Sequence, residues 1–65
     1  MYVVCINNDL ISNRITLDKI YKVESNFYNK YVIVNDRGRS GCYSMDRFIL
    51  LRLYRLNKLL SWKQT

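Results

Sequence analysis

The stretch that decides the fold, residues 31–38, reads YVIVNDRG. Its first half is a β-branched and aromatic run of the kind that is enriched in strands. Its second half predicts a tight reversal, because Asp36 can bond its own backbone and Gly38 tolerates the positive φ of a short hairpin loop. We therefore predict a central strand over residues 28–34 that turns back into another strand over residues 41–44.

Three further strands are predicted around this hairpin. Residues 19–24, KIYKVE, alternate apolar and polar side chains, so Tyr21 and Val23 are expected to face the core of a half-buried strand. A first strand is predicted over residues 2–6, where an apolar run ends at the turn-forming stretch NND. Residues 48–51, FILL, predict a short closing strand. Five short strands joined in this order indicate a small barrel.

The end of the chain has a different period. Its apolar residues fall at helical spacing, which predicts a helix from residue 52 onward: Leu53, Leu56, Leu59 and Leu60. Before it, residues 44–47 predict a single helical turn capped by Ser44. The alternative is a longer helix beginning near Met45, because Ile49 extends the same apolar stripe. We predict a barrel over residues 1–51 and a basic amphipathic tail over residues 52–65, packed together as one domain.

Residues 10–18 show no sustained period and are predicted to form a long loop. Its apolar residues are expected to pack it onto the body: Leu10, Ile11, Ile15 and Leu17. The position of this loop makes it a candidate binding loop. The aromatic residues expected in the core are Tyr21, Tyr31, Tyr43 and Phe48.

At 65 residues the chain has room for one domain, and a hydrophobic content of 49% favours a folded core over disorder. It begins without a positively charged targeting segment and has no apolar run of membrane-spanning length. We expect a soluble, cytoplasmic protein. Cys5 and Cys42 lie in predicted strands, so buried free thiols are predicted, and a single disulfide is the alternative.

The positive charge is concentrated in the second part of the chain. The formal net charge is +6, and residues 1–36 contain four basic and four acidic residues, which cancel. Residues 37–65 contain seven basic residues against Asp46 alone. This distribution favours an acidic partner for the C-terminal part.

Catalytic and metal-binding patterns are missing from the sequence. It contains no histidine, no glycine-rich phosphate loop and no Cys-x-x-Cys pair. Asp9, Asp18 and Asp46 are expected in turn or capping roles rather than as a catalytic pair. We predict that the chain is not an enzyme and binds neither a cofactor nor a structural metal.

Three stretches of the sequence resemble small SH3-like barrel proteins of bacteriophages. They are ITLDKIYKV at residues 15–23, YVIVNDRG at 31–38, and GCY with DRF at 41–43 and 46–48. The resemblance covers roughly residues 1–51. It implies a five-stranded SH3-like barrel whose last short strand follows a helical turn, and it supports fold better than function.

Size, missing catalytic groups and this resemblance predict stoichiometric binding, with a phage factor that inhibits or redirects an acidic host protein as the expected function. The predicted contacts are Arg37, Arg39, Arg47, Arg52 and Arg55, with Tyr54 and Trp62 as apolar anchors. Nucleic acid is the alternative partner, because small barrels can present stacking surfaces beside basic residues.

The apolar residues of the tail form a leucine stripe, Leu53, Leu56, Leu59 and Leu60, which must be covered by some surface. The stripe is expected to pack back over an open end of the barrel. The alternatives are that the stripe lies on an anionic membrane surface or forms a dimer interface.

Overall fold

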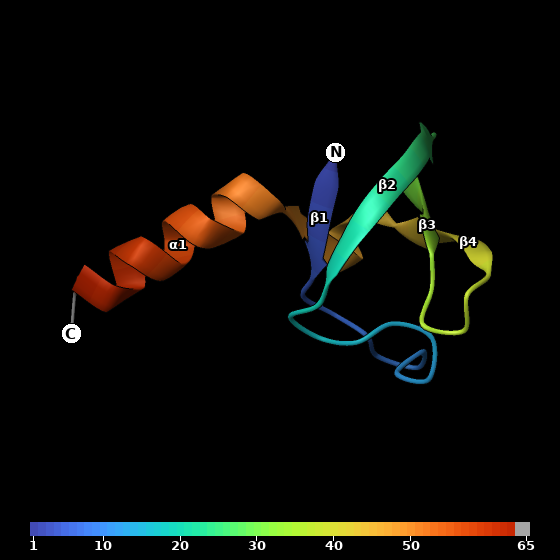
Figure 1. Ribbon diagram of the computed structural model, residues 1–65, viewed down its shortest axis with the longest axis horizontal. Helices are drawn as coiled ribbons and strands as arrows, with labels where there is room; N and C mark the ends of the chain where they lie inside the picture. Colours follow the sequence, from blue (N-terminus) through green and yellow to red (C-terminus); the bar gives the residue numbers. More distant parts are fainter. Residues whose placement is uncertain (64–65) are drawn as a thin grey trace.

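The structure is a computed structural model that describes the backbone of residues 1–63 and the side chains of residues 1–59 (Figure 1). Its elements are β1 (Tyr2–Cys5), β2 (Ile20–Phe27), β3 (Lys30–Val34), β4 (Ser40–Ser44), the 3-10 turn η1 (Met45–Arg47), β5 (Phe48–Leu50) and α1 (Leu51–Lys63). The predicted mainly β chain with a C-terminal helix is confirmed.

The five strands form one antiparallel sheet in the order β4-β3-β2-β1-β5. Residues 45–47 connect β4 at one end of this order directly to β5 at the other end. In this short connection the Ser44 hydroxyl accepts a hydrogen bond from the Asp46 backbone N–H, which confirms the predicted cap. Over the described residues the sheet is not closed into a barrel.

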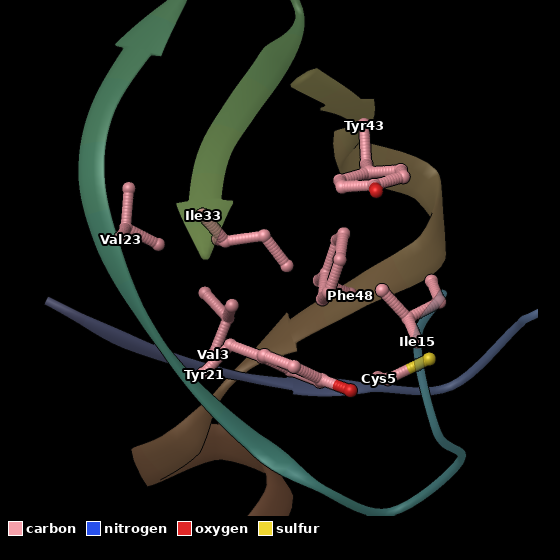
Figure 2. Close-up of a cluster of buried hydrophobic side chains, with 8 residues drawn as sticks. All are labelled: Val3, Cys5, Ile15, Tyr21, Val23, Ile33, Tyr43 and Phe48. Atoms are coloured by element: carbon pink, nitrogen blue, oxygen red, sulfur yellow. The ribbon is translucent and has the colours of Figure 1, made fainter. Parts of the chain in front are cut away.

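A bulge in β2 bends the sheet. Val23 pairs with Ile33 and Ser25 pairs with Val32, so Glu24 is an extra residue on β2. Such a bulge increases the local bend and twist of a strand. The first half of β2 pairs with β1 and the second half with β3, and the strand curves around the apolar side chains between them (Figure 2).

The core lies inside this bend and draws on every strand and on the long loop. Its buried members are Val3, Cys5, Ile15, Tyr21, Val23, Ile33, Tyr43 and Phe48 (Figure 2). The inward positions predicted for Tyr21 and Val23 are confirmed. Tyr31, which was also predicted in the core, is only partly buried and packs against the edge of the cluster.

The loop before β2 is packed down by fewer residues than expected. Ile15 is fully buried and Ile11 packs against the core, as predicted. Leu10, however, is 99% exposed and Leu17 is half-exposed, so those two predictions are wrong. Leu10 has a φ of 69° in a turn closed by the hydrogen bond from Ile11 N–H to the Asn8 carbonyl, and this turn projects its side chain outward.

The two cysteines are both free, and they differ in environment. Cys5 is buried, as predicted, and burial raises the pKa of its thiol. Cys42 is exposed, so the prediction of a buried thiol is wrong there. Successive residues of a strand face opposite sides, and Tyr43 occupies the inward position on β4. Its neighbour Cys42 therefore points away from the core.

Replacing Gly41 by Ala is expected to lower the free energy of unfolding by about 1–2 kcal/mol. A Cβ at this position would lie 2.9 Å from the Tyr43 hydroxyl oxygen and 3.0 Å from a carbon of its ring. Tyr43 is buried, and its hydroxyl accepts a hydrogen bond from the Asn35 side chain, so the ring cannot move away freely. Urea unfolding measures the change. Ser40→Ala, an exposed site on the same strand, should shift stability by no more than about 0.5 kcal/mol, and an equal loss in both variants would refute the steric explanation.

α1 begins at Leu51, directly after β5 and one residue earlier than predicted. The alternative of a helix beginning near Met45 is wrong, because η1 and β5 precede it. The helix contacts the sheet mainly at β1 and β5 and then runs away from it, and the molecule is 38 Å long and only 22 × 17 Å across (Figure 1).

The leucine stripe does not pack over the body as expected. Leu53, Leu56 and Leu59 are 41%, 50% and 57% exposed. Leu51 and Tyr54 are the partly buried positions among the described side chains of α1. The start of α1 therefore packs against the β1–β5 end of the sheet, and the apolar stripe of Leu53, Leu56 and Leu59 is left exposed.

Candidate partner-binding site

Tyr54 fixes α1 against the loop that precedes β2. Its hydroxyl donates a hydrogen bond to Asp18 Oδ1 across 2.7 Å. One turn further on, the Lys58 ammonium lies 4.8 Å from the centre of the Tyr54 ring, within the range of a cation–π interaction. The ring is half-buried. Tyr54, predicted as an apolar anchor for a partner, is thus placed where it positions the helix.

The outward side of α1 combines leucines with unpaired positive charge. Arg52 and Arg55 are exposed, and neither guanidinium lies within 4 Å of a carboxylate among the side chains of residues 1–59. The helix sequence LRLYRLNKLLSWK contains no acidic residue that could neutralise them. At roughly 100° per residue, Arg52 and Arg55 lie between Leu51 on the sheet side and Leu56 on the outward side. This surface suits a ligand that offers both carboxylates and apolar groups.

Arg37 and Arg39 lie in the turn between β3 and β4, at the far end of the molecule from α1 (Figure 1). Asn35 builds this turn: its Oδ1 accepts the backbone N–H groups of both arginines, at 2.9 and 3.1 Å. Gly38 has the positive φ, 76°, that the sequence predicted for this hairpin. Both arginine side chains are exposed, and they form a basic tip separate from the helix.

Arg47 is held by the loop after β1. Its guanidinium donates to the backbone carbonyls of Asn7, at 3.5 Å, and Asp9, at 3.0 Å. The Arg47 carbonyl in turn accepts the backbone N–H of Ile6 at 2.8 Å. Arg47 thus joins η1 to this loop, and the structure places it apart from the exposed arginines of α1.

The predicted contact residues are therefore divided. Arg52, Arg55 and Tyr54 share the first two turns of α1, whereas Arg37 and Arg39 share the hairpin tip. The remaining predicted anchor, Trp62, has a side chain that lies outside the described residues.

A polar cluster that the sequence did not predict joins the long loop to the β3–β4 turn. The Asp36 carboxylate accepts hydrogen bonds from the Lys19 ammonium, at 2.7 Å, the Tyr21 hydroxyl, at 2.7 Å, and the Thr16 hydroxyl. The hydrogen bonds from Lys19 and Thr16 lower the pKa of Asp36 to about 2. Burial is the main cause that raises the pKa of Tyr21 to about 12. These contacts span 15 to 20 residues, and their geometry indicates a structural role.

The end of β2 and the turn that follows it present two exposed aromatic rings, at Phe27 and Tyr28. Tyr28 was predicted as the first residue of the central strand, and it lies in the turn instead. Phe27 is 57% and Tyr28 85% exposed, and their rings meet edge to face with centroids 4.5 Å apart. Tyr28 has a φ of 54°, which is uncommon for a bulky residue. The adjacent turn-former Asn29 is the sequence signal that could have placed a turn here.

Within residues 1–63, no group of three or more His, Cys, Asp or Glu side chains lies close enough together to hold a metal ion. The same part of the chain contains no helix with the length and apolar character needed to cross a bilayer.

Comparisons of the chain with protein-family models, with curated proteins and with solved structures found no match.

Proposed function

We propose that this chain is a non-enzymatic binding protein that recognises an acidic protein surface through α1 and acts stoichiometrically. The observation that carries the proposal is the combination of exposed Leu53 and Leu56 with unpaired Arg52 and Arg55 on a helix that projects from the sheet. Exposed apolar and arginine side chains side by side are typical of protein interfaces.

Charge favours an acidic partner over a second copy of the chain. The described helix carries only positive charge, and the formal net charge of the whole chain is +6. Two such helices packed together would bring like charges into contact, which opposes association. An acidic surface would instead pair with Arg52 and Arg55 through charge-assisted hydrogen bonds while its apolar side chains cover the leucines.

Nucleic acid is the second candidate, and it is supported by the basic tip at Arg37 and Arg39 and by the exposed rings of Phe27 and Tyr28. Single-strand binding uses a continuous basic groove lined by stacking aromatic residues. Here the two exposed arginine pairs lie apart, Arg37 and Arg39 in the β3–β4 turn and Arg52 and Arg55 on α1, and the outward side of α1 presents leucines. The protein partner is therefore the proposal that we favour.

The proposal that the partner is a host protein rests on the resemblance to phage SH3-like proteins. The order of the strands and the 3-10 turn before the last short strand support an SH3-like relationship even though the sheet is open. On this basis we propose a phage protein that inhibits or redirects an acidic protein in the host cytoplasm.

The test is a fluorescence-anisotropy titration against four kinds of labelled probe. They are a synthetic helical peptide with Leu and Glu on separate faces, single-stranded nucleic acid, duplex nucleic acid, and anionic phosphatidylglycerol vesicles. We expect the peptide to bind most tightly. Tight nucleic-acid binding with a log affinity that falls linearly with log salt, and weak peptide binding, would replace the proposal by the nucleic-acid function. Preferential vesicle binding would replace it by surface attachment to lipid.

A matched pair of charge reversals locates the contact. Arg52→Glu/Arg55→Glu is expected to weaken peptide binding by about tenfold or more, because attraction becomes repulsion at the interface. Arg37→Glu/Arg39→Glu changes the net charge equally at the far end of the molecule, and its effect is expected to stay within about threefold. The same loss in both variants would mean that overall charge, and no site on α1, controls binding.

A further inference from the structure

A crevice of about 420 Å³ opens where α1 leaves the sheet. It is lined by Met1, Tyr2, Leu50, Leu51, Arg52 and Arg55. The first turn of α1 and the last residue of β5 form one wall, and the start of β1 forms the other. Its volume falls in the range of clefts that bind ligands.

The walls of the crevice are mainly apolar, and the charged side chains that line it among the described residues are those of Arg52 and Arg55. Met1 and Tyr2 are 53% and 51% exposed, so an inserted apolar group would remove their surface from water. Arg52 and Arg55 are three residues apart on one side of the helix, where both guanidinium groups can reach a ligand at the rim. Neither has a carboxylate partner among the described side chains. An apolar group with carboxylates beside it complements this arrangement.

We propose that the crevice receives one bulky apolar side chain, such as Phe or Leu, from an acidic peptide segment of the partner, whose neighbouring carboxylates pair with Arg52 and Arg55. This inference rests on the proposed function and names the feature that the partner must carry. It is favoured by the position of the arginines between the crevice and Leu56. A segment lying over them brings one apolar side chain to the crevice and others to the exposed leucines.

The first test is a double-mutant cycle between the protein and the peptide probe. One peptide carries a single Phe among its Leu and Glu residues, and its twin carries Ala at that position. We expect the Phe peptide to bind the unaltered protein about tenfold more tightly. In Tyr2→Ala this advantage should shrink to roughly threefold or less. Tyr28→Ala, which removes an exposed ring outside the crevice, should preserve the full advantage and is the matched control.

The second test uses the unaltered protein, so it does not depend on how a variant folds. The chain has two methionines, Met1 in the crevice and Met45 in η1, and labelling their methyl groups with ¹³C gives two NMR signals. The Phe peptide is expected to shift the Met1 signal and leave the Met45 signal in place. Decanoate is added separately as a free amphiphile and should shift Met1 only weakly.

The outcomes separate this inference from the proposed function. If the two peptides bind equally, but binding still requires Arg52 and Arg55, the crevice inference is overturned and the proposed function stands. If neither peptide binds, both fail. If decanoate shifts Met1 as strongly as the Phe peptide at equal concentration, the crevice accepts free amphiphiles and the peptide assignment is overturned.

Discussion

Phe48→Ala is expected to lower the free energy of unfolding by about 3–5 kcal/mol. Phe48 is 6% exposed, and its ring meets the rings of Tyr21 and Tyr31 edge to face, with centroids 6.2 and 5.9 Å apart. Its removal leaves a cavity that the other core residues fill incompletely. The total stability expected for a domain of this length is only about 3–10 kcal/mol. The substitution should therefore remove a large fraction of the total stability.

Urea unfolding followed by circular dichroism measures this effect. Phe27→Ala is the matched control, because it deletes the same side chain from a position that is 57% exposed. We expect the control to cost less than about 1 kcal/mol. A loss below about 1 kcal/mol for Phe48→Ala would mean that the two halves of the bent sheet do not pack on this ring.

Acid is expected to remove the stabilisation that Asp36 provides. Its pKa is lowered from 3.8 to about 2, first by the hydrogen bond from Lys19 and then by that from Thr16. Because the folded state binds the proton more weakly, the contribution is fully present above the unfolded pKa and is lost as the pH falls through about 2. Linkage corresponds to about 2 kcal/mol, and solvent access to the side chain, which is 22% exposed, reduces this to about 1–2 kcal/mol.

The comparison of the unaltered protein with Asp36→Asn isolates this contribution. At pH 6 the variant should be less stable by about 1–2 kcal/mol, and near pH 2 the two proteins should be almost equal in urea unfolding. A difference that stays constant from pH 6 to pH 2 would show that the charge of Asp36 is not what stabilises the cluster.

The opposite sign applies to Tyr21 at high pH. Its folded pKa is raised from 10.0 to about 12, with burial as the largest cause. The stability linked to its neutral form is therefore fully present below the unfolded pKa and is lost as the pH rises through about 12. The two groups whose titration affects stability at the two extremes of pH are joined by one hydrogen bond, from the Tyr21 hydroxyl to Asp36.

Local patterns predicted the parts of the fold that local physics controls. The alternation at residues 19–24 placed Tyr21 and Val23 in the core, because strand geometry alone sends successive side chains to opposite faces. The turn at Gly38 and the cap at Ser44 likewise depend on a few neighbouring atoms. These features can be predicted without knowledge of the rest of the chain.

Features that depend on distant contacts were missed. The bulge at Glu24 arises from the register between β2 and β3, and β2 continues beyond residue 24, where the strand was predicted to end, as far as Phe27. The hydrogen bond from Thr16 to Asp36 joins residues that are 20 apart in the sequence. The residues around Thr16 and those around Asp36 contain no pattern that predicts this contact. The outward leucines of α1 were expected to be covered, and they are exposed. Amphipathic patterning shows that a helix has an apolar face, but it gives no information about what covers that face.

The candidate site shows the same division. Composition pointed to Arg52 and Arg55 because charge asymmetry is visible in the sequence, and the structure places both residues on the surface. It could not separate them from Arg47, whose guanidinium donates to loop carbonyls 40 and 38 residues away in the sequence. The crevice also escaped prediction, since it brings residues 1–2 next to residues 50–55.

The central claim, that α1 is the binding surface, is tested most directly by ¹H–¹⁵N NMR mapping of the complex with the Leu/Glu helical peptide. We predict shifts in the backbone signals of residues 51–59 and of Tyr2, beside the crevice, with the signals of residues 37–39 unchanged. Shifts confined to residues 37–39, or to the turn at Phe27 and Tyr28, would contradict the account and move the binding surface to the other end of the molecule.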